Sequence, residues 1–170
     1  KNNSIINKVK KIFKKNKYKD GHILEISEQS DQYINKISEI VLKNNGLIIL
    51  IDYGNFYSTG YSTLKSIKNH KNLNILDNPG EQDISYMIDF AYISSLFYSK
   101  KLYVYGPFFQ GDFFTALGIN KRKDRILKNT SIKNKQYIED GVNKIIDNNK
   151  MGKLFKVLIA SSRKLKLYEE

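Results

Sequence analysis

The chain has 170 residues, of which 41% are hydrophobic and 12% aromatic, so it can build the core of about one domain and is not a disordered chain. It contains no cysteine, which excludes disulfides, cysteine metal sites and cysteine nucleophiles and fits a reducing compartment. No stretch approaches the roughly 18 consecutive apolar residues of a membrane span.

The formal net charge of +12 is concentrated in two segments. Residues 1–20 carry +7 and residues 120–136 carry +6, whereas residues 21–119 carry −3. The interpretation that we favour is a lysine-rich solubilising surface. The alternative is a phosphate-binding face, formed if the two clusters meet in space. We expect residues 1–20 to form a basic N-terminal arm or helix, followed by a domain over residues 21–170.

The first predicted element is an amphipathic helix that begins after Ser27. A serine side chain can cap a helix N-terminus, and apolar residues follow at helical spacing, namely Tyr33, Ile34, Ile37, Ile40 and Val41. The run Asn44-Asn45-Gly46 ends this helix, because asparagine and glycine tolerate the left-handed conformation of a C-cap.

An aliphatic strand is predicted next, over Leu47–Tyr53. Five aliphatic residues in succession are typical of a strand that is buried on both faces of a mostly parallel sheet. In such α/β sheets, ligands bind outside the carboxyl ends of the strands. Asp52 and Tyr53 stand at that end and are therefore candidate site residues.

The remaining elements alternate between helices and strands. Residues 54–82 are expected to be irregular, with a short helix over Thr63–His70. Asp89 can cap a helix over Phe90–Ser99. Later elements are predicted as two strands and three helices, namely Leu102–Tyr105, Asp112–Leu117, 121–129, 134–148 and Leu154–Ala160.

The common catalytic and nucleotide-binding motifs are absent from the sequence. There is no Walker loop, no Gly-x-Ser-x-Gly elbow and no Gly-x-Gly-x-x-Gly loop. His22 and His70 have no companion ligands nearby in sequence, so no metal site is expected.

Acidic residues between Pro79 and Phe90 suggest a pocket for a cation. Carboxylates accept bidentate hydrogen bonds from a guanidinium, so Asp83 and Asp89 are candidate contacts for an arginine substrate. They could instead serve as a turn residue and a helix cap. Gln110 follows a strand, and its amide can contact a substrate or cap the next helix.

Several short phrases together resemble the MidA-like family, whose mitochondrial members are complex I assembly factors that methylate arginine. In order, the phrases are Asp52-Tyr53-Gly54, Thr63-Leu64, His70-Lys71, Asn78-Pro79-Gly80-Glu81, Asp83, Ile88-Asp89-Phe90, Gly106-Pro107, Gln110-Gly111, Phe113-Phe114, Leu117-Gly118-Ile119, Arg122, Met151-Gly152 and Phe155-Lys156-Val157. The resemblance covers nearly all of residues 21–160.

This resemblance implies the C-terminal part of a class I methyltransferase, an α/β Rossmann-like fold with a mostly parallel sheet and an antiparallel last strand. Leu47–Tyr53 would be the fifth strand, and the segments near Leu102 and Leu154 the sixth and seventh. The family's glycine-rich cofactor loop and ribose-binding acidic residue lie in its N-terminal half. No residue of this chain is therefore expected to bind S-adenosylmethionine, and a half-sheet would expose the edge and one face of its inner strand.

The resemblance further implies methyl transfer to a protein arginine, with a respiratory complex I subunit as one possible substrate and a separate N-terminal half as a possible partner. Substrate contacts would come from Asp52, Tyr53, Asp83, Asp89 and Gln110. The location would be the bacterial cytoplasm or, in a eukaryote, the mitochondrial matrix. The alternatives are a non-catalytic assembly module or a gene remnant, and, less favoured, a basic nucleic-acid-binding domain.

Overall fold

The computed structural model describes residues 6–7, 9–10, 19–69 and 71–166. The chain divides into two compact units, one comprising Lys1–Glu28 and Ser58–Tyr86 and the other Gln29–Tyr57 and Met87–Glu170. Within the predicted basic segment 1–20, residues 6, 7, 9 and 10 are helical, and most of that segment lies outside the described residues.

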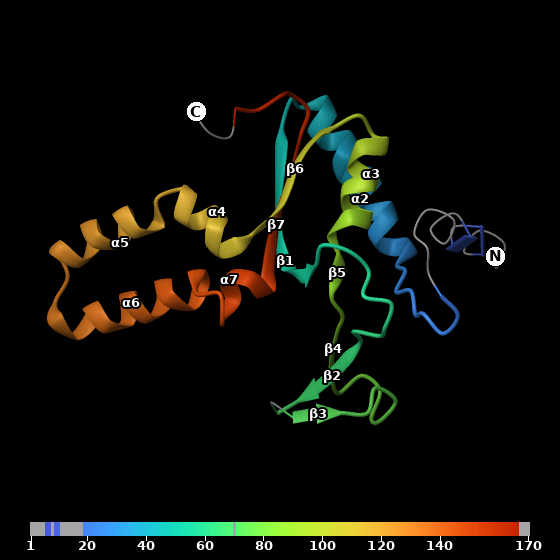
Figure 1. Ribbon diagram of the computed structural model, residues 1–170, viewed down its shortest axis with the longest axis horizontal. Coiled ribbons are helices and arrows are strands. Elements are labelled where there is room, and N and C mark those ends of the chain that lie inside the picture. Colours follow the sequence, from blue (N-terminus) through green and yellow to red (C-terminus); the bar gives the residue numbers. More distant parts are fainter. Residues whose placement is uncertain (1–5, 8, 11–18, 70, 167–170) are drawn as a thin grey trace. The chain divides into compact units, whose positions relative to one another are not determined.

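The larger unit is built on a four-stranded sheet with the order β5–β1–β7–β6 (Figure 1). Its strands are β1 (Leu47–Asn55), β5 (Ile88–Asp89), β6 (Tyr103–Phe109) and β7 (Phe155–Ser161). The last strand, β7, lies between β1 and β6 and is antiparallel to both. Because β1 and β6 each oppose β7, they run in the same direction.

The predicted α/β class and antiparallel last strand are therefore confirmed. The insertion of β7 makes most of the ladder within this chain antiparallel, and parallel pairing is confined to β5 and the end of β1, where Gly54 pairs with Ile88 and Asn55 with Asp89. The connection from β1 to β5 contains no helix and runs through the smaller unit, whereas a helix over Phe90–Ser99 separates β5 from β6.

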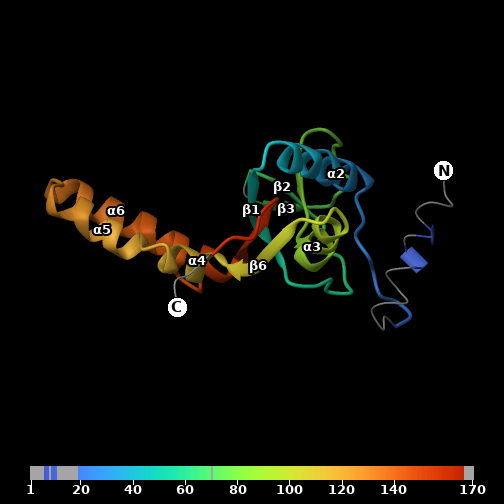
Figure 2. The same cartoon turned by 90° about the horizontal axis from the view of Figure 1, so that it is seen from above.

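Two helices cover one face of the sheet, α2 (Glu28–Lys43) and α3 (Phe90–Ser99), and Figure 2 shows them from above. Both confirm the sequence prediction: α2 begins directly after Ser27, and Asn45 beyond its end has a positive φ of 51°. The core between helices and sheet contains Ile34, Val41, Phe90, Ile93, Phe97, Leu102, Leu158 and Ala160. Ile48 and Leu50 of β1 pack against it.

The opposite face of the sheet is covered over only part of its width. Helix α4 (Gln110–Ala116) contributes Phe113, which packs against Val157 and Ile159 of β7. The outer strand β1 presents Leu47, Ile49 and Ile51 on this face, and they are 50%, 49% and 40% exposed. The prediction that this strand is buried on both faces is wrong for this chain, because nothing among the described residues covers its second face. The expectation that a half-sheet exposes one face of its inner strand is confirmed.

A helical hairpin follows α4 and comprises α5 (Ile119–Lys128) and α6 (Ile132–Ile146), which lie side by side and extend away from the sheet (Figure 1). The short helix α7 (Met151–Leu154) returns the chain to β7. The bounds of α5 and α6 agree with the predicted helices 121–129 and 134–148 to within two residues, whereas α7 was not predicted. Among the described residues, no helix combines the length and apolar composition needed to cross a bilayer.

The smaller unit holds a three-stranded antiparallel sheet with the order β3–β2–β4, formed by β2 (Lys65–Lys68), β3 (Lys71–Leu73) and β4 (Asp83–Ser85). The predicted helix over Thr63–His70 is wrong, since its centre forms β2; His70 itself lies outside the described residues. The backbone of β2 pairs with a strand on each side. One of these strands, β4, lies 16 or more residues further along the chain, and a local residue pattern does not reveal so distant a partner.

Candidate functional site

The carboxyl end of β1 holds Asp52 and Tyr53, as predicted. Asp52 is half-buried, and its Oδ1 accepts a hydrogen bond of 2.7 Å from the backbone N–H of Tyr53. Among the described residues the second carboxylate oxygen, Oδ2, has no hydrogen-bond partner. The Tyr53 ring packs against Phe155 of β7, with ring centroids 6.2 Å apart. One carboxylate oxygen and a phenol are thus available at this end of the sheet.

Lys156 lies directly across from Asp52 on β7 and is only 6% exposed. The two side chains form no ion pair; instead Nζ of Lys156 donates to the backbone oxygens of Lys153 at 2.6 Å and Leu154 at 3.2 Å. Burial lowers the pKa of Lys156 below its ordinary value of 10.5.

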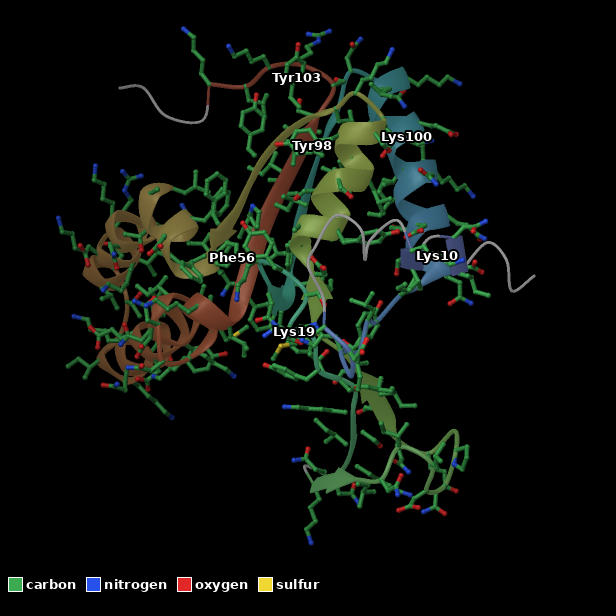
Figure 3. The ribbon with its side chains drawn as sticks, turned by 45° about the vertical axis from the view of Figure 1, so that its right-hand side comes forward. Lys10, Lys19, Phe56, Tyr98, Lys100 and Tyr103 are labelled. Atoms are coloured by element: carbon green, nitrogen blue, oxygen red, sulfur yellow. The ribbon has the colours of Figure 1, made fainter. Side chains whose placement is uncertain are left out.

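Two phenylalanine rings face the Lys156 ammonium. Nζ lies 5.6 Å from the ring centroid of Phe56 and 5.5 Å from that of Phe109. The rings touch edge to face with centroids 5.0 Å apart, and Phe56 is labelled in Figure 3. A cation between two aromatic faces is a favourable arrangement. This cluster of Lys156, Phe56 and Phe109 lies where β1, β6 and β7 meet at one end of the sheet. The cluster was not predicted from the sequence. The signal that could have indicated it is a lysine within an otherwise apolar strand.

Asp89 is the last residue of β5 and caps α3, with its Oδ1 accepting from the backbone N–H of Tyr92 at 2.9 Å. It is paired in register with Asn55, so it lies at the same end of the sheet as Asp52. Gly54 makes this pairing possible: a Cβ at that position would overlap the backbone of Ile88, 2.8 Å from its nitrogen. The glycine of the Asp52-Tyr53-Gly54 phrase thus has a packing role.

Gln110 begins α4 and is 4% exposed, and its Nε2 donates to the backbone oxygen of Ile145 at 2.9 Å. Beside it, Gly111 and Gly152 approach each other and the carbonyl of Ile146 too closely for a side chain on either. Through these contacts, residues of the Gln110-Gly111 and Met151-Gly152 phrases hold the C-terminal end of α6 against α4 and α7.

Asp83 is the first residue of β4 and lies in the smaller unit, whereas Asp52 and Asp89 lie in the larger one. The organising carboxylate of that unit is Glu25, which sequence reasoning missed. It accepts hydrogen bonds from the backbone and hydroxyl of Thr63 at 2.7 and 2.6 Å and from the backbone of Leu64 at 3.0 Å. Glu25 thus holds the loop that leads into β2.

The part of the chain that the structure describes contains no group of three acidic or histidine side chains able to hold a metal ion. The backbone N–H of Lys19 donates a hydrogen bond to Nδ1 of His22, at 3.3 Å.

The fold of the chain is shared with solved structures. The chain superposes on an uncharacterized protein from Burkholderia thailandensis with a TM-score of 0.72 at 23% identity, covering 85% of this chain and 40% of that one. A second Burkholderia thailandensis structure, solved with S-adenosyl-homocysteine bound, gives a TM-score of 0.71 at 23% identity. These likenesses define the fold as that of this group of proteins.

Residues 1–108 match the family described as "Putative S-adenosyl-L-methionine-dependent methyltransferase". The match spans more than half of the chain, which therefore belongs to this S-adenosylmethionine-dependent methyltransferase family.

Curated relatives carry a more specific name. The chain is 35% identical over 104 residues to the Caenorhabditis elegans "Protein arginine methyltransferase NDUFAF7 homolog, mitochondrial", a stretch that is 61% of this chain and 24% of the relative. It is 26% identical over 133 residues to the Homo sapiens protein arginine methyltransferase NDUFAF7, 78% of this chain and 30% of the relative. The matched stretch thus spans about a quarter to a third of these relatives' length.

The residues at the carboxyl edge do not form a cradle for S-adenosylmethionine. A nucleoside cofactor of this kind needs a glycine-rich strand–turn–helix and an acidic residue for its ribose. The edge instead presents Phe56, Phe109 and a buried lysine at the ends of β1, β6 and β7, and Gly54 is occupied with strand pairing. Phe56, Phe109 and the buried lysine are better suited to line a substrate site than to hold this cofactor.

Proposed function

We propose that this chain forms the substrate side of an S-adenosylmethionine-dependent protein arginine methyltransferase. The observation that carries the proposal is Asp52, a carboxylate with one unpartnered oxygen at the carboxyl end of β1. Ligands of open α/β sheets bind outside this end. Membership of the methyltransferase family and the arginine-methylating relatives support the reaction type.

In this proposal Asp52 accepts a hydrogen bond from the substrate guanidinium through its second oxygen. The carboxylate offsets the guanidinium charge and fixes the orientation of the nitrogen that takes the methyl group. Correct alignment of nucleophile and methyl carbon supplies most of the rate enhancement in such a direct transfer. Tyr53 lines the same strand end beside Phe155.

Asp89, Asp83 and Gln110 are proposed as further substrate contacts. Asp89 shares the sheet end with Asp52, although its carboxylate also caps α3. Gln110 would contact substrate with its amide oxygen or its second N–H, since one N–H donates to the backbone oxygen of Ile145. Asp83 is the first residue of β4 in the smaller unit.

The cofactor itself is proposed to bind to a different polypeptide segment that packs beside β1. The exposed side chains of Leu47, Ile49 and Ile51 support this, because burying them would give β1 the two covered faces that its composition predicts. The protein substrate would be a respiratory complex I subunit, and the location the mitochondrial matrix or a bacterial cytoplasm.

A chimera tests the proposal. This chain would replace the matching stretch of the Caenorhabditis elegans relative, and transfer of labelled methyl groups from S-adenosylmethionine to arginine peptides would be measured. We expect transfer by the chimera and a loss of at least about tenfold with Asp52→Asn. Asp112→Asn, an exposed carboxylate on α4, is the matched control and should leave transfer unchanged. Equal activity of the Asp52→Asn chimera would remove Asp52 from the mechanism.

A non-catalytic assembly module is the second candidate function, and the structural roles of Asp89 and Gln110 favour it. Two residues expected to meet substrate are already engaged in capping α3 and anchoring α6. This candidate predicts an inactive chimera that still binds its protein partner. Calorimetry of the chain alone with S-adenosylmethionine adds a check: measurable binding would contradict both the module and the proposed placement of the cofactor.

A further inference from the structure

The helical hairpin formed by α5 and α6 has a large exposed surface. Neither helix contains a buried residue, and both figures show the two helices packed side by side away from the sheet (Figures 1 and 2). The hairpin is held at its base, where Gln110 binds the backbone of Ile145. Its distal end, around residues 126–137, is therefore presented to the surroundings.

The hairpin is strongly basic along α5 and the first turns of α6. Between residues 119 and 137 there is one acidic residue, Asp124, against the basic residues Lys121, Arg122, Lys123, Arg125, Lys128, Lys133 and Lys135. Within the described part of the chain, none of these seven forms an ion pair. At 100° per residue, Lys121, Arg125 and Lys128 fall on one side of α5 and form a stripe of like charge. Such a stripe attracts an anionic surface.

Apolar side chains stand out from the same region. Ile132 is 87% exposed, Tyr137 is 82% exposed and Ile126 is 39% exposed. Ile126 lies in the last turn of α5 and Ile132 begins α6, so both lie next to the turn between the helices. Large apolar residues exposed together beside lysine and arginine mark an interaction surface.

We propose that the tip of this hairpin docks on an anionic lipid bilayer surface. A bilayer accepts protruding aliphatic side chains at its headgroup boundary while its anionic headgroups pair with the flanking lysines and arginines. A folded acidic protein would need a groove shaped for Ile132 and Ile126. Single-stranded nucleic acid would be bound mainly by stacking on aromatic rings, and Tyr137 is the only aromatic residue between 119 and 137.

Vesicle flotation with the full chain tests this inference. The probes are vesicles of phosphatidylcholine alone and of an equal mixture of phosphatidylcholine and phosphatidylserine, each at low and high salt. We expect binding to the mixed vesicles that falls steeply with salt, and little binding to phosphatidylcholine alone. Arg125→Glu with Lys128→Glu should lower the bound fraction at least about tenfold, and Ile132→Ser should lower it severalfold.

Matched controls lie on α2 of the same unit. Lys36→Glu with Lys43→Glu changes the net charge by the same amount, and Ile40→Ser removes an isoleucine that is 54% exposed; both should leave binding unchanged. Circular dichroism checks that each variant folds. Absence of vesicle binding at low salt, an equal effect of the control pair, or displacement of the vesicles by a lower concentration of single-stranded RNA would each overturn the inference.

Discussion

Ile49 and Ile159 face each other across neighbouring strands on the same side of the sheet, yet one is 49% exposed and the other 3%. Both residues are isoleucines in extended strands, and both side chains leave the same face of the sheet. The difference comes from their neighbours. Ile159 lies on β7, which has a strand on each side and packs beneath Phe113 of α4. Ile49 lies on β1, which over Leu47–Tyr53 is paired with β7 alone among the described residues. Burial is thus decided by the surroundings of a strand, and a fully apolar sequence does not guarantee it.

The covered face of the same sheet gives the largest expected effect. Phe97 of α3 is completely buried in the core against β7. Phe97→Ala should lower the free energy of unfolding by about 3–5 kcal/mol, through lost apolar contact and a residual cavity. Tyr98→Ala, at a neighbouring position that is 59% exposed, is the control and should cost less than about 1 kcal/mol. Urea unfolding measures both, and equal losses would mean that α3 does not cover this face.

The junction between β1 and β5 gives the next largest effect. Gly54→Ala places a methyl group against the backbone of Ile88 and should destabilise the fold by about 1–3 kcal/mol. Gly141→Ala in α6 is the matched control, since no atom lies within 4 Å of its added Cβ. It should stabilise the chain by about 0.5–1 kcal/mol, because alanine is the better helix former. Equal tolerance of the two substitutions would show that β5 does not pair closely with β1.

The sequence predicted the elements whose signals are local. The Asp89 cap with its helix over Phe90–Ser99, the end of α2 at Asn44-Asn45-Gly46 and the apolar strand β7 were recognised close to their bounds. The predicted strand Leu102–Tyr105 was too short, because β6 continues through Gly106-Pro107 to Phe109. It failed where pairing partners are distant. Strand β2 was taken for a helix because its hydrogen-bond partners lie in β3 and β4, and the half-burial of β1 depends on what lies beside it.

The same contrast between local signals and distant partners applies to the candidate site, of which only the residues at the strand ends were predicted. Asp52 and Asp89 are polar residues at strand ends, and the structure places both strand ends together. Lys156 was overlooked because its significance depends on Phe56 and Phe109, which are far apart in sequence. Glu25 was overlooked because a glutamate in a short extended segment gives no hint that it binds a loop near residue 63. Whether Asp83 belongs to the site stays a prediction.

Lys156 is a buried cation on β7, and its contribution to the free energy of unfolding should depend on pH. Because burial lowers its pKa below 10.5, the folded chain binds this proton less tightly than the unfolded chain. Its unfavourable contribution is therefore relieved as the pH rises from the lowered pKa towards 10.5. The stability of the wild type relative to Lys156→Met should increase from neutral to alkaline pH. Lys153→Met, at an exposed position, should show no such trend, and a flat difference for Lys156→Met would contradict the shift.

The smallest expected effect belongs to the open face. Ile49→Thr keeps a β-branched side chain and should change the free energy of unfolding by less than about 0.5 kcal/mol, because Ile49 loses little burial. The same substitution at the paired position on β7, Ile159→Thr, should lower the free energy of unfolding by about 1–3 kcal/mol, because it buries a hydroxyl without an assured hydrogen-bond partner. Ile49→Thr should also reduce self-association at high protein concentration, measured by sedimentation, because it interrupts the Leu47–Ile49–Ile51 stripe. If Ile49→Thr proved as costly as Ile159→Thr in the chain alone, a second copy would have to cover β1 in solution, and the concentration dependence of that cost would show it.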